Sequence, residues 1–366
     1  MKNPMDSSYL EMAYGLAEKA RGWARPNPYV GAVLVRKEKI VGYGYHERPG
    51  KAHAEVVALD RAGSLARGST LFVTLEPCVQ WGRTPPCLGA VLRAGLARVV
   101  ISSPDPNPIV FNKGIRALRA AGIEVSVGLL EDRNRNLNET YYKYITRGIP
   151  FVTLKAAVSL DGRISSRLFD SRWISSAQTR EYVHLVRGEY DAIMVGINTI
   201  LKDDPRLTVR HPHWQGKKIA RVILDSSLRL PLEARILTTL REGKIIVFTS
   251  KKSPAKKAAA LRQKGAEVVE IPGSAKKLEL QEVLHRLGQR GLSSLLVEGG
   301  SLVLTAMLEE RLADKFFLTI SPRLIGGEGA PSFFEGKGIS RISESLELQK
   351  TTSFKIGKDI IVEGYF

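Results

Sequence analysis

The sequence contains only two cysteines, Cys78 and Cys87, in 366 residues. A structural zinc site is normally closed by four Cys or His ligands, and near these thiols only His46 and His53 are available to add to them. The chain also lacks an apolar run long enough to span a bilayer, and the polar stretch 1–8 shows no secretory signal. We therefore expect a cytoplasmic protein with no membrane partner. That setting disfavours a structural disulfide, although a bond between the two thiols stays an alternative.

Low-complexity tracts and internal repeats are also missing, and no G-x-G-x-x-G run is present to predict a Rossmann fingerprint. The length suits two domains rather than one, and 43% apolar residues suffice for ordinary cores. A polar, charged helix is expected over 131–147, and Pro150 precedes a new strand. We place the boundary there, with domains 1–147 and 148–366 joined by a short tether.

Two short stretches carry the chemistry expected of the first domain. His53-Ala54-Glu55 and Glu76-Pro77-Cys78, with Cys87 further on, supply one imidazole, two thiols and one spare carboxylate. Three protein ligands leave a fourth zinc position open for water, whose pKa the metal lowers toward ~7. A glutamate outside the ligand set can then move protons, as in nucleobase deaminases with an H-x-E…P-C-x-x-C pattern. Here eight residues, rather than two, separate the cysteines.

The flanking patterns place these residues at the ends of secondary-structure elements. Apolar runs predict strands over 30–35, 40–45, 71–75, 99–101 and 125–127, and helical spacing predicts helices over 55–62 and 115–121. His53 and Glu55 are then expected in the first turn of one helix, and Cys87 in the first turn of another. Unpaired N–H groups and the helix dipole favour a thiolate and metal binding there. The alternation of strands and helices indicates a sheet between helical layers.

Strands followed by turns recur in the second half. They are expected over 151–159, 192–195, 221–224, 245–249 and 295–297. After the last of them, Glu298-Gly299-Gly300-Ser301 leads into an apolar helix over 302–312. A Gly-Gly pair at that place lets backbone N–H groups approach phosphate oxygens. A simple tight turn between strand and helix is the other interpretation.

Positive charge is in excess: 55 Lys and Arg residues against 37 Asp and Glu give a net charge of +18, spread over both halves. Phosphate-bearing substrates account for part of it, and a basic surface steers anions. The same balance suits nucleic acid, so an alternative is a polynucleotide (tRNA) editing deaminase whose C-terminal half binds RNA. Neither half shows the interleaved aromatic and basic residues of such a domain. A zinc scaffold without turnover is a third class, but it has no need of Glu55.

The combined motifs resemble those of the bifunctional riboflavin-biosynthesis deaminase–reductases. The deaminase half is matched by Asn27-Pro28-x-Val30-Gly31, His53-Ala54-Glu55, the stretch 76–87 with its wide cysteine gap, and Asp105-Pro106-Asn107-Pro108. The reductase half is matched by Ser159-Leu160-Asp161-Gly162, Arg172-Trp173-Ile174-Ser175, Asp203-Asp204-Pro205 and Val297-Glu298-Gly299-Gly300. The resemblance covers nearly the whole chain. It implies an α/β protein: a cytidine-deaminase-like α/β/α sandwich followed by a dihydrofolate-reductase-like α/β domain.

The resemblance also implies two successive reactions. A diaminopyrimidinone bearing a phosphoribosylamino group first loses a ring amino group as ammonia, and NADPH then reduces the ribose carbon to open the sugar into a ribityl chain. Zinc is implied on His53, Cys78 and Cys87, with Glu55 as the catalytic residue that moves protons. The residues implied to hold this substrate are Asn27, His46, Arg83, Asp105 and Asn107. A homo-oligomer is expected, and a nucleic-acid partner is not.

In the reductase half the residues carried over from the resemblance form two sets. Those expected to contact NADPH are Ala157, Trp173, Thr199, Asp203, Ser226, Gly299 and Gly300. Those expected to face the sugar phosphate are Lys155, Ser171, Arg187, Leu207, Arg210 and Glu298, of which Lys155 and Glu298 are the catalytic candidates for proton management. The guanidinium groups of Arg187 and Arg210 suit bidentate binding of phosphate. The ordinary alternatives are Trp173 as a core residue and Asp203 as a helix cap or turn residue.

Overall fold

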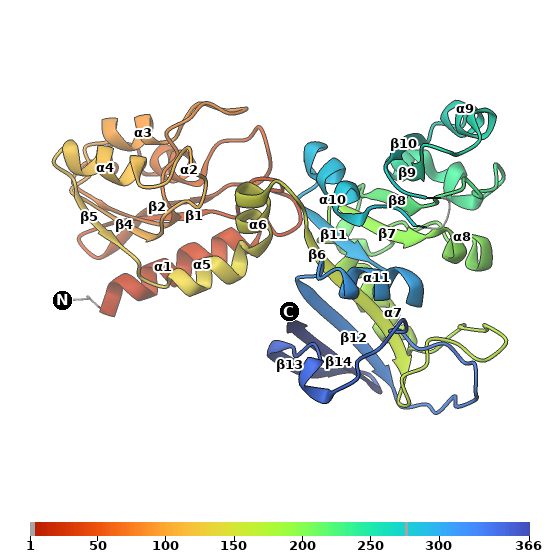
Figure 1. Cartoon of the computed structure of the whole chain (residues 1–366). Helices are drawn as coiled ribbons and strands as arrows, with labels where there is room; N and C mark the ends of the chain where they lie inside the picture. The colour runs from red at the N-terminus through yellow and green to blue at the C-terminus, as the bar shows by residue number, and fades with distance from the viewer. Residues whose placement is uncertain (1–3, 275–276) are drawn as a thin grey trace. The chain divides into compact units, whose positions relative to one another are not determined.

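A computed structural model describes residues 4–274 and 277–366, which form two compact units that divide between Gly148 and Ile149 (Figure 1). The first unit contains α1 (Pro4–Glu18), β1 (Gly31–Arg36), β2 (Lys39–Tyr45), α2 (Ala54–Ala62), η1 (Gly63–Ala66), β3 (Thr70–Leu75), α3 (Leu88–Arg93), β4 (Arg98–Ser103), α4 (Lys113–Ala120), β5 (Glu124–Val127), α5 (Glu131–Leu137) and α6 (Glu139–Arg147).

The second unit begins with β6 and ends with β14. Its elements are β6 (Phe151–Ser159), α7 (Ala177–Gly188), β7 (Ala192–Gly196), α8 (Ile197–Asp203), η2 (Pro212–Trp214), β8 (Ala220–Leu224), η3 (Arg235–Glu242), β9 (Ile245–Ser250), α9 (Ala255–Gln263), β10 (Glu267–Ile271), α10 (Leu280–Gln289), β11 (Ser294–Val297), α11 (Ser301–Glu309), β12 (Lys315–Ser321), η4 (Ile342–Glu344), β13 (Gln349–Ile356) and β14 (Asp359–Tyr365).

The sheet of the first unit has the order β2-β1-β3-β4-β5. Strand β1 pairs antiparallel with both β2 and β3, whereas β3, β4 and β5 run parallel. Because side chains alternate across a strand, Ala32 and Leu34 pack on the face covered by α2, and Val33 and Val35 pack on the face covered by α1. Figure 1 shows α1 and α5 on one side of this sheet and α2, α3 and α4 on the other.

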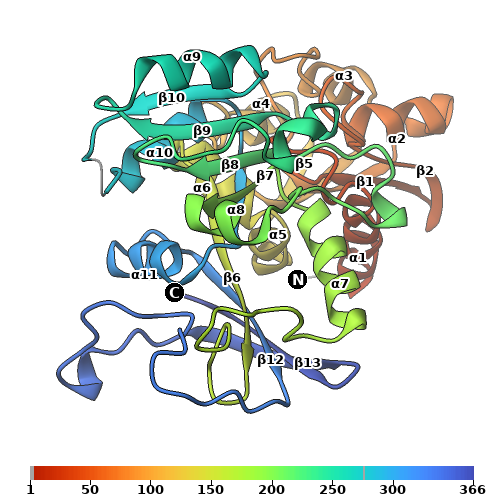
Figure 2. The ribbon, with the colours of Figure 1, turned by 90° about the vertical axis from the view of Figure 1, so that its right-hand side faces the viewer.

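The sheet of the second unit has the order β10-β9-β8-β7-β11-β6-β12-β14-β13. The strands from β10 to β12 are parallel, and β14 and β13 continue the sheet antiparallel. On β7, Met194 joins the core under α10 and α11, and Ile193 joins the core under α8 and α9. Figure 2 shows β8, β9 and β10 together, with β6 and β12 running away from them. The carboxyl ends of the parallel strands from β10 to β12 lie along one edge of the sheet, and open parallel sheets bind their ligands at that edge.

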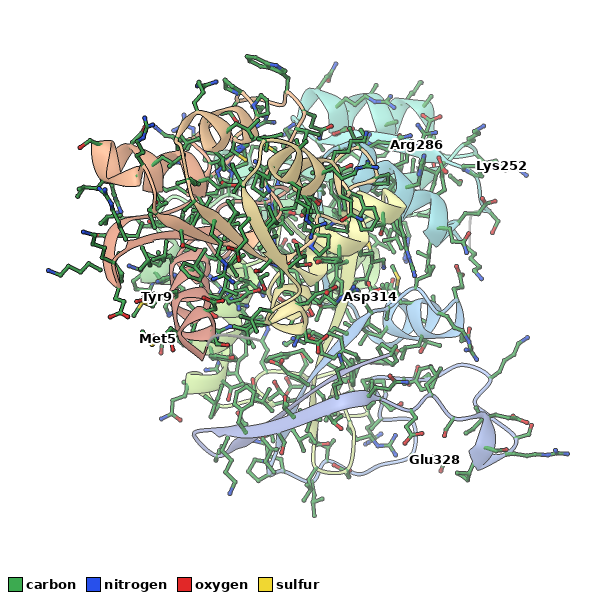
Figure 3. The ribbon with its side chains drawn as sticks, turned by 90° about the vertical axis from the view of Figure 1, so that its left-hand side faces the viewer. Met5, Tyr9, Lys252, Arg286, Asp314 and Glu328 are labelled. Atoms are coloured by element: carbon green, nitrogen blue, oxygen red, sulfur yellow. The ribbon has the colours of Figure 1, made fainter. Side chains whose placement is uncertain are left out.

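The expected strands are confirmed to within a few residues, and the alternation of helices and strands produces the expected layers. Two helical expectations are wrong, and several elements were not expected at all, among them α1 and the strands β10, β12, β13 and β14. The sequence reasoning missed α1, on which Tyr9, labelled in Figure 3, packs its ring against Phe72 at 5.0 Å between centroids. The single helix over 131–147 is broken at Asn138, and the helix expected to reach residue 312 ends at Glu309.

Asn138 lies at the break between α5 and α6. Its side chain is buried, accepts a hydrogen bond from the Tyr29 backbone N–H and donates one to the Tyr29 carbonyl. A buried polar group needs partners of this kind, and the backbone of Asn138 is not helical, with φ −105° and ψ 22°. Within the described residues, none of the helices is both long and apolar enough to span a membrane.

Candidate functional site

Three element ends bring the zinc-ligand candidates of the first unit together. His53 is the N-cap residue of α2, and Cys87 is the N-cap residue of α3, one position before the first turn in which each was expected. Cys78 follows β3 after Glu76-Pro77, at the carboxyl end of a parallel strand. The imidazole and the two thiols form one cluster, with their ligand atoms within 4.8 Å of one another.

The geometry of this cluster fits a tetrahedral zinc ion. Cys78 Sγ lies 3.4 Å from His53 Nδ1 and 3.5 Å from Cys87 Sγ. Tetrahedral bonds of ~2.3 Å to sulfur and ~2.0 Å to nitrogen place S and N about 3.5 Å apart and two sulfurs about 3.8 Å apart. One nitrogen and two sulfurs are also a donor set that zinc prefers. Three ligands leave the fourth position for a reacting molecule.

The sulfur atoms are not bonded to each other. Both cysteines are free thiols, and their separation is far beyond the ~2.05 Å of a disulfide. Each backbone N–H donates to the other residue's sulfur, from Cys78 to Cys87 at 3.2 Å and from Cys87 to Cys78 at 3.4 Å. The hydrogen bond with Cys87 lowers the pKa of Cys78 well below that of an ordinary thiol, against the opposing effect of burial. The disulfide alternative is therefore excluded.

Glu55 reaches the cluster from the first turn of α2. Its Oε1 accepts a hydrogen bond from Cys87 Sγ at 3.0 Å, and only 3% of the residue is exposed. Burial raises the pKa of this carboxyl, and the Cys78 sulfur adds to the increase. A carboxyl group whose pKa is moved toward neutrality can both take and give a proton near physiological pH.

Asn27 and His46 form a second polar pair in this unit. Asn27 Nδ2 lies 3.0 Å from His46 Nε2, and His46 Nδ1 lies 3.1 Å from the Ala52 carbonyl. A carbonyl only accepts, so Nδ1 carries the hydrogen and Nε2 accepts from the Asn27 amide. Burial lowers the pKa of His46, which favours this neutral form. The two rings of His46 and His53 meet edge to face, with centroids 5.5 Å apart.

Asp105 and Asn107 lie in the loop after β4, which Glu76 holds in place. The Glu76 carboxylate accepts from the backbone N–H groups of Asp105, Asn112 and Ile115 at 3.0–3.2 Å. Sequence reasoning gave Glu76 no such role, because its partners lie 29 to 39 residues away. Asp105 Oδ1 in turn accepts from the Asn107 N–H and the Tyr141 hydroxyl, both at 2.9 Å. Arg83, by contrast, is exposed on the loop between the cysteines.

We expect Asp105→Asn to stabilise the zinc-free protein at neutral pH. Burial raises the pKa of Asp105 from 3.8 to about 6, so above pH 6 the folded state carries an ionised, desolvated carboxylate. The raised pKa means that stability is lost as pH rises from about 4 to 6, by up to ~3 kcal/mol. An asparagine avoids that cost. Thermal unfolding of chelator-treated protein should show a higher Tm for the variant at pH 7.5 and no difference near pH 3.5. Equal Tm values at both pH values would contradict this.

A cavity of about 760 Å³ lies at the carboxyl ends of the parallel strands in the second unit. Nine of the residues expected in the reductase site line it: Lys155, Ala157, Ser171, Thr199, Asp203, Ser226, Glu298, Gly299 and Gly300. Gly299 has a packing reason to lack a side chain, since a Cβ there would approach Val303 at 2.8 Å. Gly300 is the N-cap residue of α11, so the Gly-Gly turn places a helix N-terminus at the cavity.

Lys155, Arg187 and Glu298 form a buried ion cluster at this cavity. Arg187 donates from Nε and Nη2 to the two Glu298 oxygens at 3.0 and 2.9 Å, and Lys155 Nζ lies 4.0 Å from the same carboxylate. Burial raises the pKa of Glu298, but the charges of Arg187 and Lys155 together outweigh it and hold the pKa at about 2. Burial lowers the pKa of Lys155, and Glu298 opposes that effect. Glu298 is therefore ionised at any working pH.

Four expected residues are not among those that line the cavity: Arg187, Leu207, Arg210 and Trp173. Arg187 also donates to the Thr208 carbonyl at 3.0 Å, so its bidentate partner in this structure is a carboxylate rather than a phosphate. Arg210 Nη2 lies 3.1 Å from Nε2 of His184, a residue that sequence reasoning missed. Leu207 packs in the core, so only its backbone can face a ligand. Trp173 is exposed, with Arg180 over its ring at 4.5 Å, which excludes the core interpretation.

Comparison with known proteins decides the family. Residues 4–103 match the cytidine and deoxycytidylate deaminase zinc-binding region, and residues 150–362 match the RibD C-terminal domain. The riboflavin biosynthesis protein RibD of Aquifex aeolicus is 44% identical over 362 residues, which are 99% of each chain. The chain belongs to the RibD family. RibD of Escherichia coli is 35% identical over 97% of this chain and 98% of its own.

Solved RibD structures agree with the fold. A structure of Acinetobacter baumannii RibD aligns with a TM-score of 0.89 at 34% identity, covering 98% of both chains. A deaminase/reductase of Thermotoga maritima aligns with a TM-score of 0.84 at 34% identity, covering 99% of this chain and 98% of the other. The chain is thus a RibD-type bifunctional deaminase and reductase of riboflavin biosynthesis, with a cytidine-deaminase-like domain and a dihydrofolate-reductase-like domain. These full-length matches favour this function over the RNA-editing alternative.

Proposed function

We propose that residues 1–147 deaminate a diaminopyrimidinone bearing a phosphoribosylamino group, and that residues 148–366 then reduce its ribose with NADPH to a ribityl chain. The observation that carries the proposal is the position of Glu55, a buried carboxyl 3.0 Å from the Cys87 sulfur and outside the ligand set. A purely structural zinc site has no use for such a group. We also propose a cytoplasmic location and self-association, in keeping with the RibD family.

In the deaminase site the protein contributes proton transfer and orientation. His53, Cys78 and Cys87 would hold a zinc ion, which would lower the pKa of a bound water. Glu55 takes a proton from the attacking water and delivers it to the ring nitrogen, and a second transfer protonates the departing amine. Its burial and raised pKa suit both directions of transfer.

The substrate contacts of this site are assigned to five residues. The Asn27–His46 pair and the Asp105–Asn107 loop supply amide, imidazole and carboxylate groups for hydrogen bonds to the pyrimidine and ribose. Arg83, exposed on the loop between the cysteines, supplies a guanidinium for the phosphate. The hydrogen bonds of His46 to the Ala52 carbonyl and of Asp105 to the Asn107 N–H keep these groups in place before substrate binds, which lowers the entropic cost of orientation.

In the reductase site the protein aligns the sugar and supplies a proton. NADPH provides the hydride; Ala157, Trp173, Thr199, Asp203, Ser226 and the Gly299-Gly300 turn are proposed to contact it. When the ribose ring opens, its ring oxygen needs a proton. Lys155 is the donor, because Glu298 has a pKa of about 2 and carries no proton to give. Ser171, Leu207 and Arg210 are proposed to face the sugar phosphate. Arg187, which is bound to Glu298, is proposed to lie beside them.

A coupled assay tests the order of the two reactions. With the pyrimidine substrate and NADPH, we expect ammonia release to precede NADPH oxidation, in equal amounts. Removal of zinc by a chelator should abolish both signals. Addition of the already deaminated intermediate should then restore NADPH oxidation alone, because the cluster of three candidate metal ligands found among the described residues, His53, Cys78 and Cys87, lies in the first unit. NADPH oxidation from the diaminopyrimidinone without ammonia release would overturn the proposed order.

A further inference from the structure

In the eight-residue loop between the cysteines, the Thr84 side chain contacts one of the zinc-ligand candidates. Trp81, Gly82, Arg83 and Pro85 are exposed, with Trp81 76% exposed. Thr84 is half-buried, and its Oγ1 lies 2.9 Å from His53 Nε2. A loop of this length is not required to bring two cysteine ligands together, since a two-residue gap does so in related patterns. The longer loop therefore supplies a hydroxyl group that contacts His53, in addition to joining the two cysteines.

The two ring nitrogens of His53 face different partners. Nδ1 lies 3.4 Å from Cys78 Sγ, on the side of the ligand cluster, whereas Nε2 lies against the Thr84 hydroxyl. A neutral imidazole carries one hydrogen, and the nitrogen that binds a metal must be the one without it. If Nδ1 is the ligand, the hydrogen is on Nε2, and that N–H needs an acceptor. A hydroxyl oxygen at 2.9 Å meets this requirement.

We propose that Thr84 is a positioning residue of the zinc site. Its hydroxyl accepts a hydrogen bond from Nε2–H, which selects the tautomer with a free Nδ1 lone pair and fixes the orientation of the ring. Thr84 acts through His53 and is not one of the proposed zinc ligands. Outer partners of this kind are worth roughly 10–100-fold in metal affinity. The inference rests on the proposed zinc ligands. Zinc binding by the wild-type protein tests those ligands, and zinc binding by the Thr84 variants tests the role of Thr84.

Zinc affinity measured by competition with a chromophoric chelator tests this role. Thr84→Val keeps the shape of the side chain and removes the hydroxyl, and we expect it to bind zinc roughly 10–100-fold more weakly than wild type. Thr84→Ser keeps the hydroxyl and should stay within about threefold of wild type, and Trp81→Ser on the same loop should not change the affinity. An affinity of Thr84→Val within threefold of wild type, or an equal loss in Thr84→Ser, would overturn the proposal.

The tautomer provides a readout that a merely structural role would leave unchanged. The chain has six histidines, so proton–nitrogen correlation NMR of histidine-labelled, zinc-loaded protein can be assigned with His53→Asn as the reference. We expect a slowly exchanging Nε2–H for His53 in wild type and in Thr84→Ser, and faster exchange of that proton in Thr84→Val. A hydrogen found on Nδ1 in the zinc-loaded wild type would refute the proposed contact.

Discussion

Replacement of Glu55 by glutamine is expected to reduce ammonia release by ~10²–10⁴-fold while zinc stays bound. Glutamine has nearly the same shape but cannot take a proton from water, and proton transfer is the role assigned to this residue. The three ligand side chains are unchanged, and the N–H group of the glutamine amide can donate to the Cys87 thiolate that zinc binding requires. Metal analysis of the variant should therefore find the wild-type zinc content.

The matched control for this variant lies on the same helix. Asp60→Asn removes an exposed carboxylate from α2 and should leave ammonia release unchanged. Glu55→Gln supplied with the deaminated intermediate should oxidise NADPH at the wild-type rate, because its defect is confined to the first reaction. Undiminished ammonia release from Glu55→Gln would remove Glu55 from the mechanism, and loss of zinc would show that it supports the metal instead.

The metal cluster was predictable because short motifs lie at the ends of strongly patterned elements. His53 and Glu55 are two residues apart at a helix start, and Cys78 follows an apolar strand, so local structure alone brings each to an end of its element. The parallel strands then place these ends on one edge of the sheet. The strands themselves were predictable since most residues of β3, β6 and β9 are apolar and nearly all of them are buried.

Contacts between distant segments were not predictable in the same way. Glu76 binds backbone groups up to 39 residues away, and Arg187 pairs with Glu298 across 111 residues. No local pattern distinguishes an arginine that binds a carboxylate from one that binds a phosphate. Helix α1 is different, because Leu10, Ala13, Tyr14 and Ala17 follow the helical repeat and are buried. Its signal was present in the sequence and was overlooked.

Replacement of Glu298 by glutamine is expected to produce the largest loss of stability. The side chains of Glu298, Arg187 and Lys155 are 12%, 11% and 17% exposed, so the variant leaves two buried cations facing a neutral amide. Removing one partner of a buried ion pair costs ~3–5 kcal/mol. For a unit of this size that cost lowers Tm by roughly 6–20 °C. Calorimetry of the full chain measures this fall in Tm. The unfolding transition of the second unit is recognised as the one that NADPH shifts to higher temperature.

The same variant should also change how reduction depends on pH. Lys155 delivers its proton only when it is charged, so reduction is lost as pH rises through the pKa of Lys155. Glu298 holds that pKa up against burial, and without the carboxylate the pKa falls further. The alkaline limb of NADPH oxidation should therefore move to lower pH, while ammonia release is unaffected. Glu270→Gln is the control, because its pair with Arg262 is about half exposed and worth at most ~1 kcal/mol. An unchanged alkaline limb in Glu298→Gln would show that Lys155 is not the proton donor.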